Sequence, residues 1–134
     1  MKRIMSFFVA VILLTVIVLP VSAEQYVQPR YTYINDVSAE LSINTTTGVA
    51  TCTGSVCARS MKPVKVVVSL QKDMGTYWQT LESWSGTGTM EIQIINRFGV
   101  YSDETYRVFT AGYVYDSNNN LLESASATHE VYYP

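Results

Sequence analysis

The sequence contains few of the residues on which most protein chemistry depends. It has two cysteines, one histidine and 15% charged residues in a chain of 134. Two cysteines are too few for a disulfide scaffold to replace a hydrophobic core, so packing must supply the stability. The formal net charge is −2 and no basic face is visible, which argues against a nucleic-acid partner.

The single histidine leaves little room for catalysis or metal binding. A hydrolytic triad needs a nucleophile, a base and a group that orients the base, and no Gly-x-Ser-x-Gly elbow accompanies His129. One histidine and two close cysteines do not complete a four-ligand zinc site. Asp116, Asn118 and Asn120 begin like a calcium loop, but Leu121 stands where that loop needs glycine. We expect no catalytic residue, metal or cofactor, and keep an unidentified hydrolase as an alternative.

Helical periodicity is also absent after residue 23. Short stretches instead alternate apolar and polar residues and are rich in β-branched and aromatic side chains, which is typical of strands. We expect seven strands, near residues 37–43, 49–56, 64–72, 76–85, 90–95, 105–115 and 121–133. Turn signals between them predict an all-β domain over 37–134, a single antiparallel β-sandwich of immunoglobulin-like type, with a barrel as the alternative. Tyr106 favours the sandwich, because it is placed to form a tyrosine corner at the start of the penultimate strand.

The one long apolar run is at the N-terminus. Lys2 and Arg3 precede an apolar stretch from Ile4 to Leu19, and small residues end it at Ala23. This order predicts a signal peptide over residues 1–23, and the stretch is slightly short for a membrane span. Cleavage removes two basic residues and turns the charge of −2 into −4. We expect an extended lead over 24–36 and a secreted, extracellular protein with no stable membrane anchor.

The two cysteines leave two interpretations open. An exported chain meets oxidising conditions, in which Cys52 and Cys57 could pair. Positions five apart on a regular strand point to opposite faces, so a bridge requires a bulge or turn, which Gly54 could supply. In the other interpretation Cys52 is a small buried hydrophobe and Cys57 stays half-exposed.

Aromatic residues are what the sequence has in plenty, with ten tyrosines and two tryptophans. In an unbroken strand Trp78, Glu82 and Trp84 share one face, with Tyr77 next to the first tryptophan. Flat rings with polar tips stack on sugars and anchor protein interfaces, so these four are the candidate ligand-stacking residues. The alternative is that the tryptophans are inside the sandwich, and a bulge between them would split their faces.

Five short strings across the chain are distinctive: PRYTYI (29–34), GVATCTGSV (48–56), VSLQK (68–72), W-x5-WSGTG (78–88) and TYRV (105–108). In these strings the chain resembles a family of small secreted proteins of Gram-positive, clostridia-like and gut-associated bacteria that carry a domain of unknown function. The resemblance implies a signal peptide and a β-sandwich, and it implies no catalytic or binding residues. Cys57 departs from the pattern, in which one cysteine stands at the position of Cys52.

The functional expectation follows from the aromatic surplus. We expect a non-enzymatic binding module for a glycan or a cell-surface protein. A structural protein that self-associates through its edge strands is the alternative, because an open sandwich leaves edges that must be protected or used.

Overall fold

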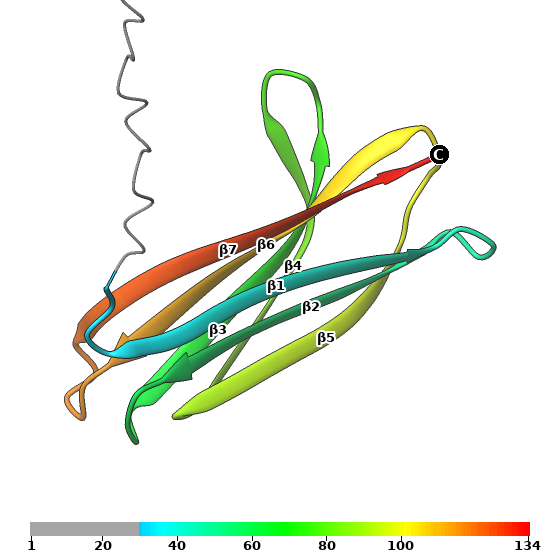
Figure 1. Ribbon diagram of the computed structural model, residues 1–134. Helices are drawn as coiled ribbons and strands as arrows, with labels where there is room; N and C mark the ends of the chain where they lie inside the picture. The colour runs from blue at the N-terminus through cyan, green and yellow to red at the C-terminus, as the bar shows by residue number, and fades with distance from the viewer. Residues whose placement is uncertain (1–29) are drawn as a thin grey trace, which may run out of the picture.

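Seven antiparallel strands form two sheets in the computed structural model, which describes residues 30–134 (Figure 1). No helix in this range is long and apolar enough to cross a membrane. The expected all-β class and number of strands are confirmed, whereas the expected signal peptide (1–23) and the first part of the expected lead, residues 24–29, lie outside the described residues. The strands are β1 (Ile34–Asn44), β2 (Val49–Ala58), β3 (Pro63–Asp73), β4 (Trp78–Thr89), β5 (Glu91–Gly99), β6 (Glu104–Tyr115) and β7 (Leu121–Tyr133).

Each sheet is built from antiparallel neighbours. The three-stranded sheet has the order β1-β2-β5 and the four-stranded sheet has the order β4-β3-β6-β7. Strands β2, β3 and β6 therefore have a partner on both sides, and they show the most regular alternation of buried and half-exposed residues. The alternation expected along 105–115 is confirmed, because its even-numbered residues are buried and its odd-numbered residues face outward.

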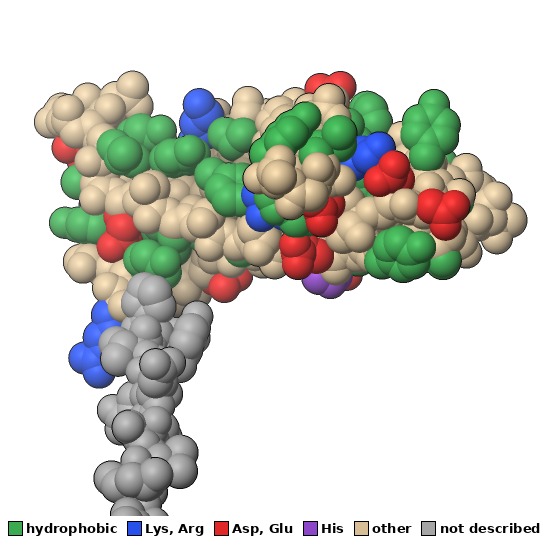
Figure 2. Space-filling view, turned by 90° about the horizontal axis from the view of Figure 1, so that it is seen from above, with side chains coloured by type: hydrophobic (Ala, Val, Ile, Leu, Met, Phe, Trp, Pro, Cys, Tyr) green, Lys and Arg blue, Asp and Glu red, His purple; other side chains and the backbone are tan. Residues whose placement is uncertain are grey.

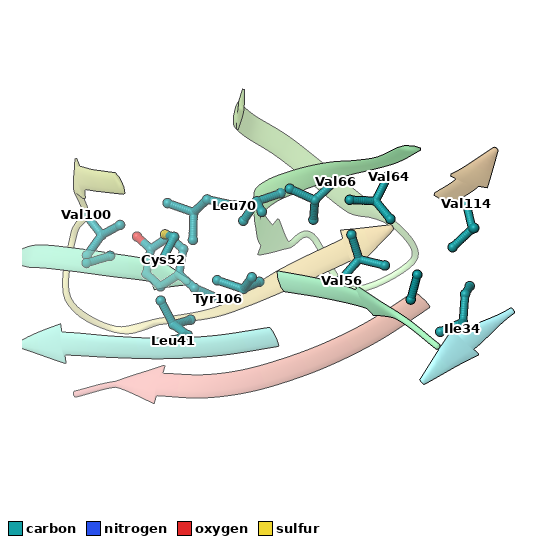
Figure 3. Packing of buried hydrophobic residues seen from close by; sticks show 14 residues of the cluster. Ile34, Leu41, Cys52, Val56, Val64, Val66, Leu70, Val100, Tyr106 and Val114 are labelled. Atoms are coloured by element: carbon teal, nitrogen blue, oxygen red, sulfur yellow. The ribbon is translucent and has the colours of Figure 1, made fainter. Parts of the chain in front are cut away.

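The hydrophobic core lies between the two sheets (Figure 3). Strands with period-two alternation bury one face only, and here the inward faces of both sheets meet. Most core side chains are aliphatic, with Tyr106 as the largest fully buried one. The buried apolar residues are Ile34, Leu41, Ala50, Cys52, Val56 and Ala58 of the three-stranded sheet, Val64, Val66, Val68, Leu70, Tyr106, Val108 and Val114 of the four-stranded sheet, and Val100 of a loop.

Two glycines allow the sheets to approach closely at the centre. A Cβ atom on Gly54 of β2 would lie 2.4 Å from Cγ2 of Val68 and 2.5 Å from Oγ1 of Thr110. A Cβ atom on Gly112 of β6 would lie 2.7 Å from Cγ2 of Val56. Real side chains do not pack at such distances, so the two sheets can reach this separation only where glycine stands.

The flank between β1 and β7 is closed by side chains of β7. The carboxylate of Glu123 accepts hydrogen bonds from the backbone N–H groups of Thr32 (2.9 Å), Tyr33 (2.8 Å) and Ile34 (2.7 Å). Further along, Nδ1 of His129 accepts the N–H of Leu41 at 2.9 Å. These bonds occupy donors that an edge strand would otherwise leave free.

The expected tyrosine corner is present at the start of β6. The Tyr106 hydroxyl donates to the carbonyl of Tyr101 at 2.9 Å and accepts the N–H of the same residue at 3.0 Å. The ring itself is buried in the core, with 1% of its surface exposed. One side chain thus fixes the loop before β6 to the interior.

Some strand boundaries differ from the sequence-based expectations. β1 begins at Ile34, ahead of the expected start at residue 37, and the register with β2 shifts between Ile34 and Asp36. The stretch with Gly86 and Gly88, expected to end a strand, lies within β4. Both glycines pack against Ile92 of β5, where a side chain would not fit. The turn follows at Met90, whose φ is 67°.

Candidate functional site

The two tryptophans of β4 lie on opposite faces of the four-stranded sheet. Trp84 is opposite the buried Val68 and packs against the core. The register then shifts, so that Leu81 is an additional residue in β4, and Trp78 comes opposite Asp73 on the outward side. A bulge of this kind reverses the side-chain alternation beyond it. The expectation that both tryptophans share one face is therefore wrong.

The other two candidate stacking residues do not join them into one strip. The Tyr77 side chain is 59% exposed in the turn between β3 and β4. Glu82 is exposed, and its Oε1 accepts the N–H of Ser83 at 3.2 Å. Tyr77 and Trp78 lie at the end of the β3–β4 hairpin, which projects from the sandwich in Figure 1. Figure 2 shows hydrophobic side chains gathered around this projection, with basic and acidic ones beside them.

The disulfide is not formed, and both cysteines are free. Cys52 points into the core, and Cys57 is half-buried on the other side of β2. The register between β1 and β2 is unbroken from Cys52 to Cys57, so the bulge that a bridge requires does not occur there. Burial raises the pKa of the Cys52 thiol to about 11.

An aromatic surface occurs instead on β6. Its outward side chains are half-buried and form what we call the β6 face: Arg107, Phe109, Ala111, Tyr113 and Tyr115. Residues that are opposite each other in the ladder share a face, so the register gives the flanking side chains. The adjacent strand β3 contributes Lys65, Val67, Ser69 and Gln71. Hydroxyl residues lie on β4, beyond β3 (Thr80, Ser83, Ser85 and Thr87), and on the adjacent strand β7 (Ser124, Ser126 and Thr128).

A shallow groove of about 410 Å³ crosses this face. Two aromatic rings, Phe109 and Tyr113, border it, and the small side chain of Ala111 lies between them. On the β7 side it is lined by Ser124, Ala125 and Ser126, and Tyr31 of the N-terminal segment completes the wall. The groove thus combines three aromatic rings with the hydroxyl groups of two serines and two tyrosines.

Arg107 is held firmly at one end of the β6 face. Its Nε donates to Oε1 of Gln71 at 2.7 Å, and the Gln71 amide nitrogen donates to Oγ1 of Thr80 at 3.1 Å. The guanidinium carbon lies 4.2 Å from the ring centroid of Trp78 and 5.8 Å from that of Phe109. The outward tryptophan therefore joins the β6 face through a cation–π contact.

A second cavity, of about 580 Å³, opens at the other end of the same face. Lys65, Tyr115 and Asn119 contribute polar groups to its wall, together with Thr87 and Thr89. The outward side of the four-stranded sheet is therefore lined by polar and aromatic groups along most of its length.

Two further features of the described residues bear on metal binding and on the single histidine. No group of three or more His, Cys, Asp or Glu side chains within residues 30–134 is arranged to hold a metal ion. His129, the one histidine, is engaged with the backbone of β1.

The chain matches none of the protein-family models and none of the curated proteins with which it was compared.

Sequence reasoning did not connect the β6 face with a ligand. The alternation along 105–115 already placed Arg107, Phe109 and Tyr113 on one side of a strand. The hydroxyl residues of β4 and β7 become part of the same surface only through the register of β4 with β3 and of β7 with β6. That pairing is non-local and carries no short sequence signal.

Proposed function

We propose that this protein is a secreted, non-enzymatic binding module of immunoglobulin-like type, and that its β6 face holds a glycan. The observation that carries the proposal is the groove in which the rings of Phe109, Tyr113 and Tyr31 surround the small side chain of Ala111. Serine hydroxyls line its β7 side. Secretion rests on the predicted signal peptide. The immunoglobulin-like type is supported by the strand order β1-β2-β5 and β4-β3-β6-β7 and by the corner at Tyr106.

The chemistry of the face suits a carbohydrate. Sugar rings have apolar faces that stack on aromatic side chains, and their hydroxyls exchange hydrogen bonds with serine and threonine. Phe109 and Tyr113 are four residues apart on one strand, which corresponds to about 13 Å. This separation is longer than one sugar ring, so the face suits an extended oligosaccharide better than a monosaccharide.

The surface also has the rigidity that such binding needs. The aromatic rings stand on β6, which is hydrogen-bonded to β3 on one side and β7 on the other. Side chains on a central strand keep their spacing when a ligand arrives, so little ordering entropy is lost on binding.

Assembly through edge strands, the other candidate function, has less support. Glu123 and His129 occupy backbone donors along the flank between β1 and β7. On the opposite flank, Gly86 and Gly88 of β4 pack closely on Ile92 of β5. Contacts with the other sheet therefore occupy part of each sheet edge, which leaves less backbone for a second molecule to pair with.

The test is retention of the mature protein on insoluble polysaccharides, bacterial wall and mucin. We expect Phe109→Ala and Tyr113→Ala to weaken retention by about tenfold each, because each change removes one stacking ring, and tenfold corresponds to about 1.4 kcal/mol. Tyr101→Ala is the matched control, because that side chain is 83% exposed and lies in the loop before β6. Thermal melts show whether each variant is folded. Retention that is equally weakened in the control, or unchanged in both groove variants, would contradict the proposal.

A further inference from the structure

Arg107 is more than a structural partner of Trp78. A guanidinium has five N–H donors in a planar fork, and its Nε is the one bonded to a side chain here, to Oε1 of Gln71. Gln71 is itself fixed by its bond to Thr80, and the ring of Trp78 lies against the guanidinium. The plane of the fork is thus set before any ligand arrives, and the two terminal nitrogens form no hydrogen bond with another residue of the described range.

Among the described residues 30–134, no carboxylate forms a salt bridge with this cation. The one salt bridge among residues 30–134 joins Lys72 to Glu104 at 2.8 Å. Glu130 is opposite Arg107 in the register with β7, yet the two side chains form no ion pair. An immobilised arginine that has no carboxylate partner on its own face is suited to bind the carboxylate of a ligand.

The position of Arg107 beside the groove indicates which molecule would carry the anionic group. Arg107 and Phe109 stand two residues apart on one side of β6, about 6.6 Å along the strand. The guanidinium carbon is 5.8 Å from the Phe109 ring centroid. A sugar that stacks on Phe109 would therefore bring a charged substituent within reach of the free edge of the guanidinium.

We propose that Arg107 makes the β6 face selective for glycans that carry a carboxylate or a sulfate group on the sugar stacked at Phe109. This inference rests on the proposed glycan-binding function and adds the class of ligand. The two oxyanions share the geometry that accepts two parallel N–H bonds from one guanidinium.

The acidic charge of the whole chain allows a local contact with an acidic glycan to be distinguished from general electrostatic attraction. The formal net charge is −2, so long-range attraction does not favour a polyanion. Glu130 on β7 and Asp73 on β3 are the acidic residues that the register places beside Arg107 and Trp78. Retention on an acidic polymer must then come from a local contact and not from general attraction.

Paired polymers provide the probes. Polygalacturonate is compared with its methyl ester, which has the same backbone without the charge, and dextran sulfate is compared with dextran. We expect the mature protein to prefer at least one charged member over its neutral partner by about tenfold or more, which is the effect of one charge-assisted bidentate contact. The pair that shows the preference distinguishes carboxylate from sulfate.

Variants then assign the preference to one side chain. Arg107→Gln should abolish it, and Arg107→Lys, which keeps the charge and loses the fork, should retain only a small part. Arg97→Gln is the matched control, since Arg97 is exposed on the outward side of the other sheet. Arg107→Gln also removes the contact with Trp78, which could disturb the fold. The preference of the unmodified protein for the charged polymer is therefore also measured at increasing salt concentration. A contact with one charge predicts that this preference declines only slowly with salt.

Four results separate the possible conclusions. A preference that disappears in Arg107→Gln and survives in Arg97→Gln supports the inference. Equal retention on charged and neutral polymers, lost in Phe109→Ala, overturns the role of Arg107 and leaves the glycan-binding function standing. A preference that persists in Arg107→Gln also overturns the inference. No retention on any polymer overturns the proposed function and the inference with it.

Discussion

Gly54 offers a direct test of how the two sheets pack. In Gly54→Ala the new methyl group would lie 2.4 Å from Cγ2 of Val68 and 2.5 Å from Oγ1 of Thr110. Both neighbours are fully buried on central strands of the opposite sheet, so neither can move aside freely. Overpacking of this kind costs about 1–3 kcal/mol, and we expect a loss of about 2 kcal/mol. In a domain of this size, that loss lowers Tm by about 10 °C.

The assay is urea unfolding and a thermal melt of the mature protein, compared with Gly99→Ala. Gly99 has no atom within 4 Å of its Cβ position and does not have a positive φ. Alanine there should leave stability unchanged or raise it by about 0.4–1 kcal/mol. Val68→Ala removes the methyl group that clashes, so the double variant should be less destabilised than the sum of the two single changes. If Gly54→Ala is as stable as Gly99→Ala, the close approach of the sheets is refuted.

Three further predictions concern single side chains. Thr110 has a buried hydroxyl with no hydrogen-bond partner in the described range, so Thr110→Val should raise stability by about 1 kcal/mol in urea unfolding; a loss would contradict this assignment. Desolvation raises the pKa of Glu123, but its three backbone N–H donors and Arg59 bring the pKa below its usual value. Its contribution to stability is therefore present above the unfolded pKa of about 4.3 and is lost as pH falls through the folded pKa, and Glu123→Gln should flatten the acid side of the stability profile. A thiol reagent should titrate Cys57 in the native protein and Cys52 only after unfolding, because Cys52 is buried; a single intramolecular disulfide in mass spectra would refute the free thiols.

The sequence predicted the strands most reliably where alternation is long and unbroken. Along β6, buried and outward residues follow strict period two, so the faces of Tyr106 and Phe109 could be assigned in advance. The tyrosine corner was also predictable, because its hydrogen bond is local and reaches only to Tyr101. Both features depend on residues that are close together in the chain.

Features that depend on pairing between strands were not predictable in the same way. The bulge at Leu81 is a property of the register between β4 and β3, and it decides that Trp84 packs inward while Trp78 faces outward. Gly86 and Gly88 read as a turn signal, although their role is to let β4 lie close to Ile92 of β5. In each case the deciding contact joins residues that no short sequence window contains.

For the candidate site too, features of the local sequence could be predicted and contacts between strands could not. The aromatic surplus led to the prediction of a stacking strip, but the strip through Trp78, Glu82 and Trp84 does not exist because of the bulge. The groove needs β6 for its two rings, β7 for its hydroxyls and the N-terminal segment for Tyr31. Its parts are spread over most of the domain, and only the fold brings them together.

Hydroxyl-radical footprinting of the protein bound to the polysaccharide that retains it tests the central claim most directly. Labelling of each aromatic side chain is measured by mass spectrometry in the free and bound states. The account predicts strong protection of Phe109, Tyr113 and Tyr31, which line the groove, and no protection of the exposed Tyr101. Protection confined to residues outside the β6 face, or retention on none of the polysaccharides, would contradict it.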